Sequence, residues 1–273
     1  MKKFVILGGG YGGRTLALHL LENEIPYDTQ IILIDRMPYM GLKTEYYALV
    51  AGTVSEHEIR VSFPDDPRLM LHYGEVQEID LENKLIRMQK GDPISYDWLA
   101  IALGCVDKFH GIEGAEQNAY TIQTLADARK TYLAINNLSP YSQVSIVGGG
   151  LSGVEVASEL RESRPDLNIR IIDRSGSILS SFPDKLKSYV RDWFLEHDVE
   201  MLSRISLKKV EPRLLSDGNR EYETDVTVWT AGIQPSPLVQ RLPVPKDDKG
   251  RVLLNAYYQI PDYPEVFVLG DCA

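Results

Sequence analysis

Cysteine is scarce in this sequence of 273 residues, and its two thiols, Cys105 and Cys272, lie far apart. A disulfide framework and a Cys-x-x-Cys zinc or redox pair are therefore excluded. Both thiols are expected to be small, inert packing groups. The five histidines show no metal-ligand spacing, and no Ser/His/Asp or paired-carboxylate signature stands out. We therefore predict no metal site and no hydrolytic chemistry.

Positive charge and long hydrophobic runs are scarce as well. The chain has 29 basic and 39 acidic side chains, a formal net charge of −10, which disfavours a nucleic acid or an anionic membrane as the main partner. Stretches such as Leu99–Val106 are far shorter than the roughly 20 residues of a membrane-spanning helix. The apolar run at the start stops at Gly8, too early for a signal peptide. The ordinary composition, 44% hydrophobic and 25% charged, predicts a soluble, cytoplasmic protein with two domains.

What the sequence does contain is a near-repeat about 140 residues apart. Each copy has an apolar run typical of a strand, then a glycine-rich turn, a helical pattern and a second strand that ends at an aspartate. The first copy comprises 4–7, 8–13, 15–21 and 31–34, and the second comprises 144–147, 148–153, 154–161 and 169–172. Each copy therefore predicts one βαβ unit.

Antiparallel strands are expected after each copy, because short apolar runs there flank turn signals. These runs are 84–88, 94–96 and 99–103 in the first half, and 207–210, 221–224 and 226–229 in the second. The runs 252–254 and 266–271 are expected to pair and to return to the first sheet. The predicted fold class is α/β, with two Rossmann-like dinucleotide-binding domains that each carry a small antiparallel β-meander.

Both glycine turns match the dinucleotide-binding pattern. Gly8 permits the tight turn, Gly10 lets the backbone approach a pyrophosphate, and Gly13 lets helix and strand pack closely. Asp35 lies 22 residues beyond Gly13, where a carboxylate can bind a ribose diol. In the second copy the corresponding residues are Gly148, Gly150, Gly153 and Asp173. Two such sites in one chain predict hydride transfer between a nicotinamide and a flavin. Asp173 favours NADH over NADPH, and Arg174 beside it partly offsets this preference.

Motifs along the whole chain resemble those of the two-dinucleotide-binding-domain flavoproteins, and among them the type II NADH dehydrogenases. This family has the pyridine nucleotide-disulfide oxidoreductase fold without the redox disulfide. The stretches that carry the resemblance are 8–13, 41–54, 96–104, 148–155, 229–232 and 270–273.

The resemblance implies FAD at the first glycine turn and NADH at the second. It implies cofactor contacts from Gly8, Gly10, Tyr11, Gly12, Gly13, Asp35, Arg36, Lys43, Val76, Ala102, Leu103, Gly104, Gly148, Gly150, Leu151, Ser152, Gly153, Glu155, Asp173, Ala231, Gly232 and Asp271. Glu155 and Lys43 are the candidate catalytic residues. From the residues alone, Glu155 in the first turn of its helix could equally be stabilised by the helix dipole, and Lys43 could be a solvated loop lysine.

Because the cysteine pair of the disulfide reductases is missing, electrons are expected to leave the flavin for an external acceptor such as a quinone, a ferredoxin or a dye. The resemblance to the type II NADH dehydrogenases favours a quinone. The alternatives are an NAD(P)H:ferredoxin-type reductase and a slow-turnover sensor that holds FAD and NADH. We expect an FAD domain of residues 1–112 and 250–273 and an NAD(H) domain of 113–249. An acceptor-binding or membrane-binding part is expected to follow in relatives, and a homodimer and peripheral membrane contact remain open.

Overall fold

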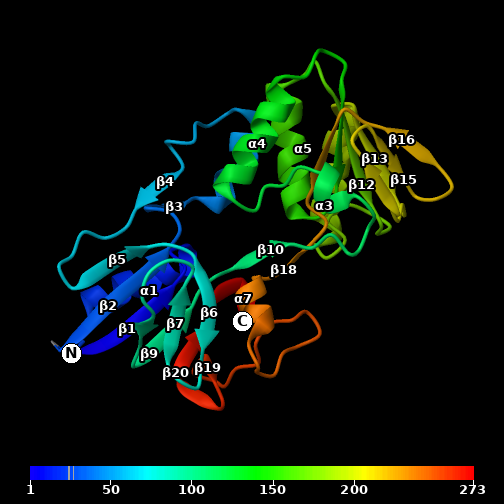
Figure 1. Cartoon of the computed structure of the whole chain (residues 1–273). Helices are drawn as coiled ribbons and strands as arrows, with labels where there is room; N and C mark the ends of the chain where they lie inside the picture. The colour runs from blue at the N-terminus through cyan, green and yellow to red at the C-terminus, as the bar shows by residue number, and fades with distance from the viewer. Residues whose placement is uncertain (24, 27) are drawn as a thin grey trace. The chain divides into compact units, whose positions relative to one another are not determined.

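The computed structural model describes residues 1–23, 25, 26 and 28–273, which form two compact α/β units (Figure 1). Unit 1 comprises Met1–Gly41, Arg60–Val106 and Gln234–Ala273. Unit 2 comprises Leu42–Ile59 and Asp107–Ile233. Both units are therefore assembled from segments that are separated in the sequence.

Unit 1 is built on a six-stranded sheet with the order β19-β20-β9-β1-β2-β5. Strands β20, β9, β1, β2 and β5 are parallel to their neighbours, and β19 is antiparallel to β20. The elements of the unit are β1 (Lys2–Leu7), α1 (Tyr11–Glu22), β2 (Thr29–Asp35), β3 (Tyr39–Gly41), β4 (Arg60–Ser62), β5 (Leu69–Tyr73), β6 (Val76–Asp80), β7 (Leu85–Met88), β8 (Ile94–Ser95), β9 (Trp98–Ile101), α7 (Pro237–Arg241), β19 (Gln259–Ile260), β20 (Tyr263–Val268) and η2 (Gly270–Cys272). The strands β10 (Cys105–Asp107) and β18 (Ile233–Pro235) pair where the chain passes between the units.

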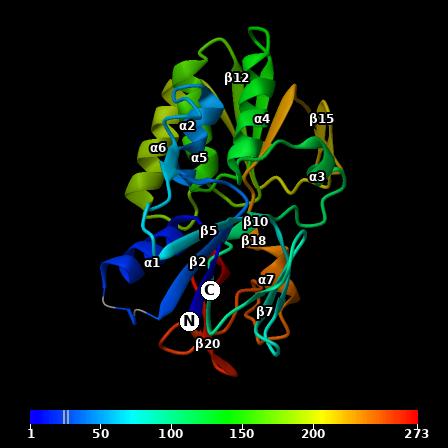
Figure 2. The ribbon, with the colours of Figure 1, turned by 60° about the vertical axis from the view of Figure 1, so that its left-hand side comes forward.

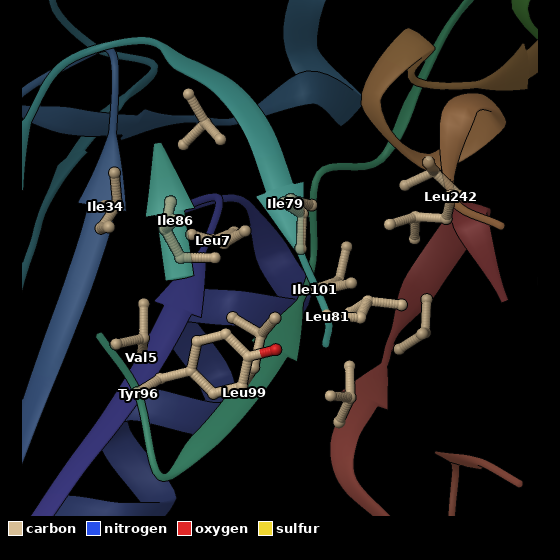
Figure 3. Packing of buried hydrophobic residues seen from close by; sticks show 14 of the residues in the cluster. Val5, Leu7, Ile34, Ile79, Leu81, Ile86, Tyr96, Leu99, Ile101 and Leu242 are labelled. Atoms are coloured by element: carbon tan, nitrogen blue, oxygen red, sulfur yellow. The ribbon is translucent and has the colours of Figure 1, made fainter. Parts of the chain in front are cut away.

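One face of this sheet packs against the antiparallel sheet β6-β7-β8 (Figure 3). Val5, Leu7 and Leu99 of the parallel sheet lie in one buried cluster with Ile79 and Ile86 of the antiparallel sheet. Burying side chains of this size contributes roughly 1.5–3 kcal/mol each. The core holds the strands in register, so the loops at their carboxyl ends are presented from a fixed edge.

Unit 2 contains a parallel sheet with the order β13-β12-β11-β17 and an antiparallel meander, β14-β15-β16. Its elements are η1 (Lys43–Glu45), α2 (Tyr46–Ala51), α3 (Ala115–Asn118), α4 (Leu125–Asn136), β11 (Gln143–Val147), α5 (Leu151–Ser163), β12 (Asn168–Asp173), α6 (Asp184–Glu196), β13 (Val199–Ser203), β14 (Lys209–Glu211), β15 (Leu214–Ser216), β16 (Glu221–Glu223) and β17 (Val226–Trp229). Trp229, Val210 and Leu215 are fully buried where meander and parallel sheet meet. The predicted fold class is confirmed in both units.

Two predicted strand pairings are wrong. The turn at Asp217-Gly218 joins β15 to β16, so 207–210 does not pair directly with 221–224, and β14 pairs with β15 instead. The run 252–254 forms no strand with 266–271. Instead Val252 makes a single bridge to Lys246, and β20 pairs with β19 and β9. The last strand does return to the first sheet, as expected.

The unit boundaries differ from the predicted domain limits in three segments, 42–59, 107–112 and 234–249, of which 42–59 is the longest. Helix α2 packs on α4 and α5, and Tyr46, Leu49 and Val50 are buried (Figure 2). The Thr53 hydroxyl donates a hydrogen bond of 2.9 Å to Glu159. These contacts place Leu42–Ile59 in unit 2, although the sequence on both sides belongs to unit 1. The other boundaries fall at 106/107 and 233/234, inside β10 and β18.

Within the described part of the chain, no helix is both long and apolar enough to cross a membrane. The same residues contain no group of three or more His, Cys, Asp or Glu side chains that could hold a metal ion.

Candidate functional site

The glycine turn of unit 1 connects β1 to α1 and has little room for side chains. Gly8 has φ +96°, and a Cβ atom there would lie 2.4 Å from the Ala102 carbonyl oxygen. A Cβ at Gly13 would lie 1.8 Å from the Gly8 carbonyl oxygen. A Cβ at Gly10, the N-cap residue of α1, would meet no atom within 4 Å. Gly8 and Gly13 therefore serve close packing, whereas Gly10 leaves open space at the helix N-terminus.

Asp35, at the end of β2, braces this turn. Its Oδ2 accepts a hydrogen bond of 2.6 Å from the Gly9 N–H, and its Oδ1 accepts one of 2.8 Å from the Met37 N–H. The strand, the turn and the carboxylate therefore form one connected structure, in which the helix N-terminus and an acidic group lie near the same sheet edge. This is the arrangement that a pyrophosphate and its ribose require.

The turn from β11 to α5 in unit 2 is built in the same way. Gly148 has φ +118°, and a Cβ at Gly153 would lie 1.9 Å from the Gly148 carbonyl oxygen. A Cβ at Gly150, the N-cap residue of α5, would again meet no atom within 4 Å. Asp173 accepts hydrogen bonds of 2.6 Å from the N–H groups of Gly149 and Ser175. In the described structure neither α1 nor α5 has a side-chain N-cap, so both helix ends suit an anionic ligand.

Unit 2 also contains a cavity of about 630 Å³ at this turn. Its lining includes Gly148–Gly150, Asp173 and the predicted contact residues Ala231 and Gly232. The predicted residues Leu151 and Ser152 begin α5 beside it, and Leu151 is exposed. The structure therefore brings five of the predicted residues of the second set, Gly148, Gly150, Asp173, Ala231 and Gly232, together around one cavity, whose size is typical of small-molecule sites.

Some cavity residues were not predicted from the sequence. His110 Nε2 lies 2.8 Å from the Ala231 carbonyl oxygen. The Thr230 hydroxyl donates to the carbonyl oxygens of Val147 and Gly148, both at 3.1 Å, and so ties β17 to the glycine turn. Thr230 lies within a motif of the resemblance, but nothing in the local sequence indicates that His110 reaches the cavity.

The remaining candidates of unit 1 gather at the carboxyl ends of its parallel strands. Ala102, Leu103 and Gly104 follow β9, and the Ala102 N–H donates to the Leu7 carbonyl oxygen at 2.8 Å. Asp271 lies in η2 after β20, and its Oδ2 is 3.1 Å from Cys105 Sγ. Parallel strands carry their ligands at this edge of a sheet. The further candidates are Gly12 and the exposed Tyr11 in α1, the exposed Arg36 after β2, and Val76, whose side chain belongs to the hydrophobic core.

Glu155 does not lie in the first turn of its helix, because α5 begins at Leu151 and not at Val154. The helix dipole acts most strongly within the first turn, so it contributes less at this position than expected. Glu155 is half-buried, and burial together with the negative charge of Glu45 raises the pKa of its carboxyl above the usual range. The pKa of the Tyr47 hydroxyl is also raised, by burial and then by Glu45, Glu155 and Glu159.

Lys43 lies in η1 and belongs to unit 2, together with Glu155. Its charge acts on Asp107, which is partly buried. Burial raises the pKa of Asp107 to about 6, while a hydrogen bond with Thr121 and the positive charge of Lys43 oppose that rise. The two predicted catalytic residues therefore lie in one unit with ionisable groups whose pKa values are raised, and such shifts are common at functional sites.

Comparison with known proteins identifies a matching family and several relatives. The family model described as pyridine nucleotide-disulphide oxidoreductase matches residues 2–273. The NADH dehydrogenase-like protein YutJ of Bacillus subtilis (strain 168) is 51% identical over 273 residues, which are 100% of this chain and 77% of that protein. The demethylphylloquinone reductase NdbB of Synechocystis sp. is 28% identical over 289 residues, covering 99% of this chain and 72% of that protein.

Among solved structures, NDH2 from Plasmodium falciparum in complex with NADH superposes with a TM-score of 0.86 at 20% identity. The match covers 99% of this chain and 64% of that chain, so this chain spans less than two thirds of the solved protein. At this identity the likeness concerns the fold.

Proposed function

This chain belongs to the pyridine nucleotide-disulphide oxidoreductase family, and we propose that it is an FAD-dependent NADH dehydrogenase that delivers electrons to a quinone. The observation that carries the proposal is the duplicated site. Each unit has a glycine turn with open space at the helix N-terminus and a carboxylate braced by a backbone N–H at 2.6 Å. A chain with one such site could be a simple nucleotide binder, whereas two of them suit electron transfer between two dinucleotides.

We assign FAD to unit 1. Open space at Gly10 would admit the pyrophosphate, Asp35 would accept hydrogen bonds from the ribose, and Asp271 would contact the ribityl chain or a phosphate. The other proposed contacts are Gly8, Tyr11, Gly12, Gly13, Arg36, Val76, Ala102, Leu103 and Gly104.

We assign NADH to the cavity of unit 2. Gly150 would face the pyrophosphate, Asp173 the adenosine ribose, and Ala231 and Gly232 the nicotinamide half. The remaining proposed contacts are Gly148, Leu151, Ser152, Gly153 and Glu155. Hydrogen bonds from Thr230 to the strand and the glycine turn keep this wall in place.

When bound, FAD accepts a hydride from a nicotinamide and releases electrons singly or in pairs to a second acceptor. The protein's contribution is orientation and charge. Glu155 is proposed to position the nicotinamide, and Lys43 to contribute positive charge beside the flavin. No thiol chemistry is required, since Cys105 and Cys272 do not form a disulfide with each other and Cys272 is buried. A quinone is the proposed acceptor because a relative of this chain is named as a quinone reductase.

The test uses the full chain and a matched pair of substitutions, Asp35→Asn and Asp173→Asn. Each removes one negative charge from one of two similar carboxylates. Losing a charged hydrogen-bond acceptor costs about 1.5–3 kcal/mol, or roughly tenfold to a hundredfold in affinity. We expect Asp35→Asn to lose FAD, measured by flavin absorbance after desalting, and to keep NADH binding. Asp173→Asn should keep the flavin and weaken NADH binding.

Anaerobic mixing of the FAD-loaded protein with NADH then tests the reaction. Rapid bleaching of the flavin absorbance, followed by reoxidation on addition of a quinone analogue, is the expected result. A protein that cannot be loaded with FAD contradicts the proposal. Slow bleaching supports the sensor alternative, and reoxidation by ferredoxin but not by quinone supports the ferredoxin-reductase alternative. Homodimer formation and peripheral membrane contact stay predictions, to be measured by light scattering and by vesicle sedimentation.

A further inference from the structure

Three basic residues of unit 2 lie either on the cavity wall or beside the loop that follows β12. Arg174 and Lys208 line the cavity. The Arg204 N–H donates to the Ser175 carbonyl oxygen at 2.9 Å, and its guanidinium lies along the same loop, since a Cβ at Gly176 would be 3.7 Å from its Nε. All three side chains are exposed. Although the chain has a net charge of −10, none of these three forms an ion pair with another residue that the structure describes.

Negative charge is sparse in the same place. Asp173 is the one acidic residue among the described residues that line the cavity. Both of its oxygens accept backbone hydrogen bonds of 2.6 Å, from Gly149 and Ser175, which partly satisfy the carboxylate. The hydroxyl-bearing residues Ser175 and Ser206 also line this part of the wall. The loop after β12 therefore carries Arg174 and Ser175 and lies beside Arg204, next to one partly satisfied carboxylate, which favours an additional anion.

The position of this group relative to the glycine turn indicates which anion it suits. A pyrophosphate belongs at Gly150, on the N-terminus of α5, and the adenosine ribose belongs beside Asp173 at the end of β12. Groups that follow directly after that strand lie near the 2′ position of the ribose, where an arginine can accommodate a 2′-phosphate. Arg174 and Ser175 are the two residues after Asp173, and Arg204 is attached to Ser175 by its backbone hydrogen bond.

We propose that the cavity of unit 2 accepts NADPH as well as NADH, with Arg174 and Arg204 as the residues that bind the 2′-phosphate and Lys208 as a further source of positive charge. This inference rests on the assignment of the nicotinamide nucleotide to unit 2. It goes beyond that assignment, because Asp173 by itself predicts discrimination against NADPH.

The experiment measures dissociation constants for NADH and NADPH by quenching of tryptophan fluorescence, since Trp229 lines the cavity. In the full-length protein we expect NADPH to bind within about tenfold of NADH. The double variant Arg174→Ala, Arg204→Ala should weaken NADPH at least tenfold more than NADH. Arg220→Ala, an exposed arginine of the β15–β16 hairpin outside the cavity, is the matched control and should leave the ratio unchanged.

Nucleotide fragments identify the recognised phosphate. In the wild-type protein 2′,5′-ADP should compete with NADPH better than 3′,5′-ADP or 5′-AMP, and the double variant should lose this preference. NADPH binding more than tenfold weaker than NADH, an unchanged ratio in the double variant, or stronger competition by 3′,5′-ADP would each overturn the inference while leaving the proposed dehydrogenase intact. If neither NADH nor NADPH binds, the proposed function itself fails.

Discussion

Two glycines of the same turn, Gly150 and Gly153, should respond to the same substitution in opposite ways. Both belong to the pattern at the start of α5, and both change to alanine by the addition of one methyl group. At Gly153 the new methyl carbon would lie 1.9 Å from the Gly148 carbonyl oxygen and 2.8 Å from the Thr230 hydroxyl oxygen. At Gly150 it would meet no atom within 4 Å.

The distances set the size of each effect. Ordinary contact of a Cβ begins near 3.4 Å, so α5 would have to move by roughly 1.5 Å to accommodate Gly153→Ala. Overpacking costs about 1–3 kcal/mol, and the upper end applies because the obstacle is backbone and not a flexible side chain. Gly150 has φ −75°, which alanine adopts without strain. Its replacement at an N-cap should cost less than about 1 kcal/mol.

The two substitutions should also weaken NADH binding in different ways, directly in Gly150→Ala and indirectly in Gly153→Ala. The Gly150 methyl group would occupy the open space where the pyrophosphate is proposed to approach the helix N-terminus. We expect Gly150→Ala to fold like the wild type and to weaken NADH at least tenfold. Gly153→Ala should lose NADH binding only together with stability, because it displaces the helix itself.

Urea unfolding and NADH titration, both followed by tryptophan fluorescence, measure the two effects in one preparation. Trp193 and Trp229 both lie in unit 2 and therefore report on its unfolding. The reasoning is refuted if Gly153→Ala is as stable as the wild type, or if Gly150→Ala destabilises the unit equally. Unchanged NADH affinity in Gly150→Ala would refute the position of the pyrophosphate.

Three further predictions concern ionisable groups and thiols. Because burial raises the pKa of Asp107 from 3.8 to about 6, its deprotonation removes folding stability as the pH rises from about 4 through 6. The full pKa shift corresponds to about 3 kcal/mol, and partial exposure of the side chain reduces this to about 1–2 kcal/mol. Asp107→Asn should therefore be more stable than the wild type by about 1–2 kcal/mol at pH 8 and equally stable near pH 4. Urea unfolding at the two pH values measures the difference. Glu45→Gln should lower the pKa of Glu155, observed by carboxyl-carbon NMR, because it removes a nearby negative charge. The control Glu82→Gln in unit 1 should leave this pKa unchanged. An unchanged pKa of Glu155 in Glu45→Gln would contradict the contribution of Glu45. The double variant Cys105→Ala, Cys272→Ala should keep NADH:quinone turnover within about twofold of the wild type. It should lose about 1 kcal/mol of folding stability, mainly because Cys272 is buried. Loss of flavin reoxidation in this variant would show that a thiol takes part.

Local sequence was sufficient to predict the two βαβ units. Apolar runs such as Phe4–Leu7 and Val144–Val147 are short, bounded by glycine and fully consistent with β1 and β11. The starts of the helices were less accurate. The sequence predicts a helix from Val154, yet α5 begins at Leu151, and its first turn includes Gly153 beside the Gly148 carbonyl oxygen.

Other features could not be predicted because they depend on residues far apart in the sequence. Strand β15 has only three residues, Leu214–Ser216, and it is stabilised by pairing on both sides with β14 and β16. His110 reaches the cavity through a contact with Ala231, 121 positions away. The effect of Glu45 on Glu155 likewise requires α2 to pack on α5. None of these pairs has a local pattern that would reveal it.

The segment 42–59 shows why the order of residues along the chain is a poor guide to which nucleotide a side chain serves. The chain enters it from β3 and leaves it into β4, two strands of unit 1 that pair with each other. Between them the segment is bound to unit 2, by the hydrogen bond of Thr53 to Glu159 and by an ion pair of 3.4 Å between Glu56 and Arg129 of α4. Lys43 and Glu45 therefore take their electrostatic environment from unit 2, where they act on Asp107 and Glu155. Lys43, to which a role toward the flavin is proposed, is therefore carried by the unit to which NADH is assigned. A substitution in η1 should consequently be tested for its effect on the binding of both nucleotides, whatever its place within the first half of the sequence.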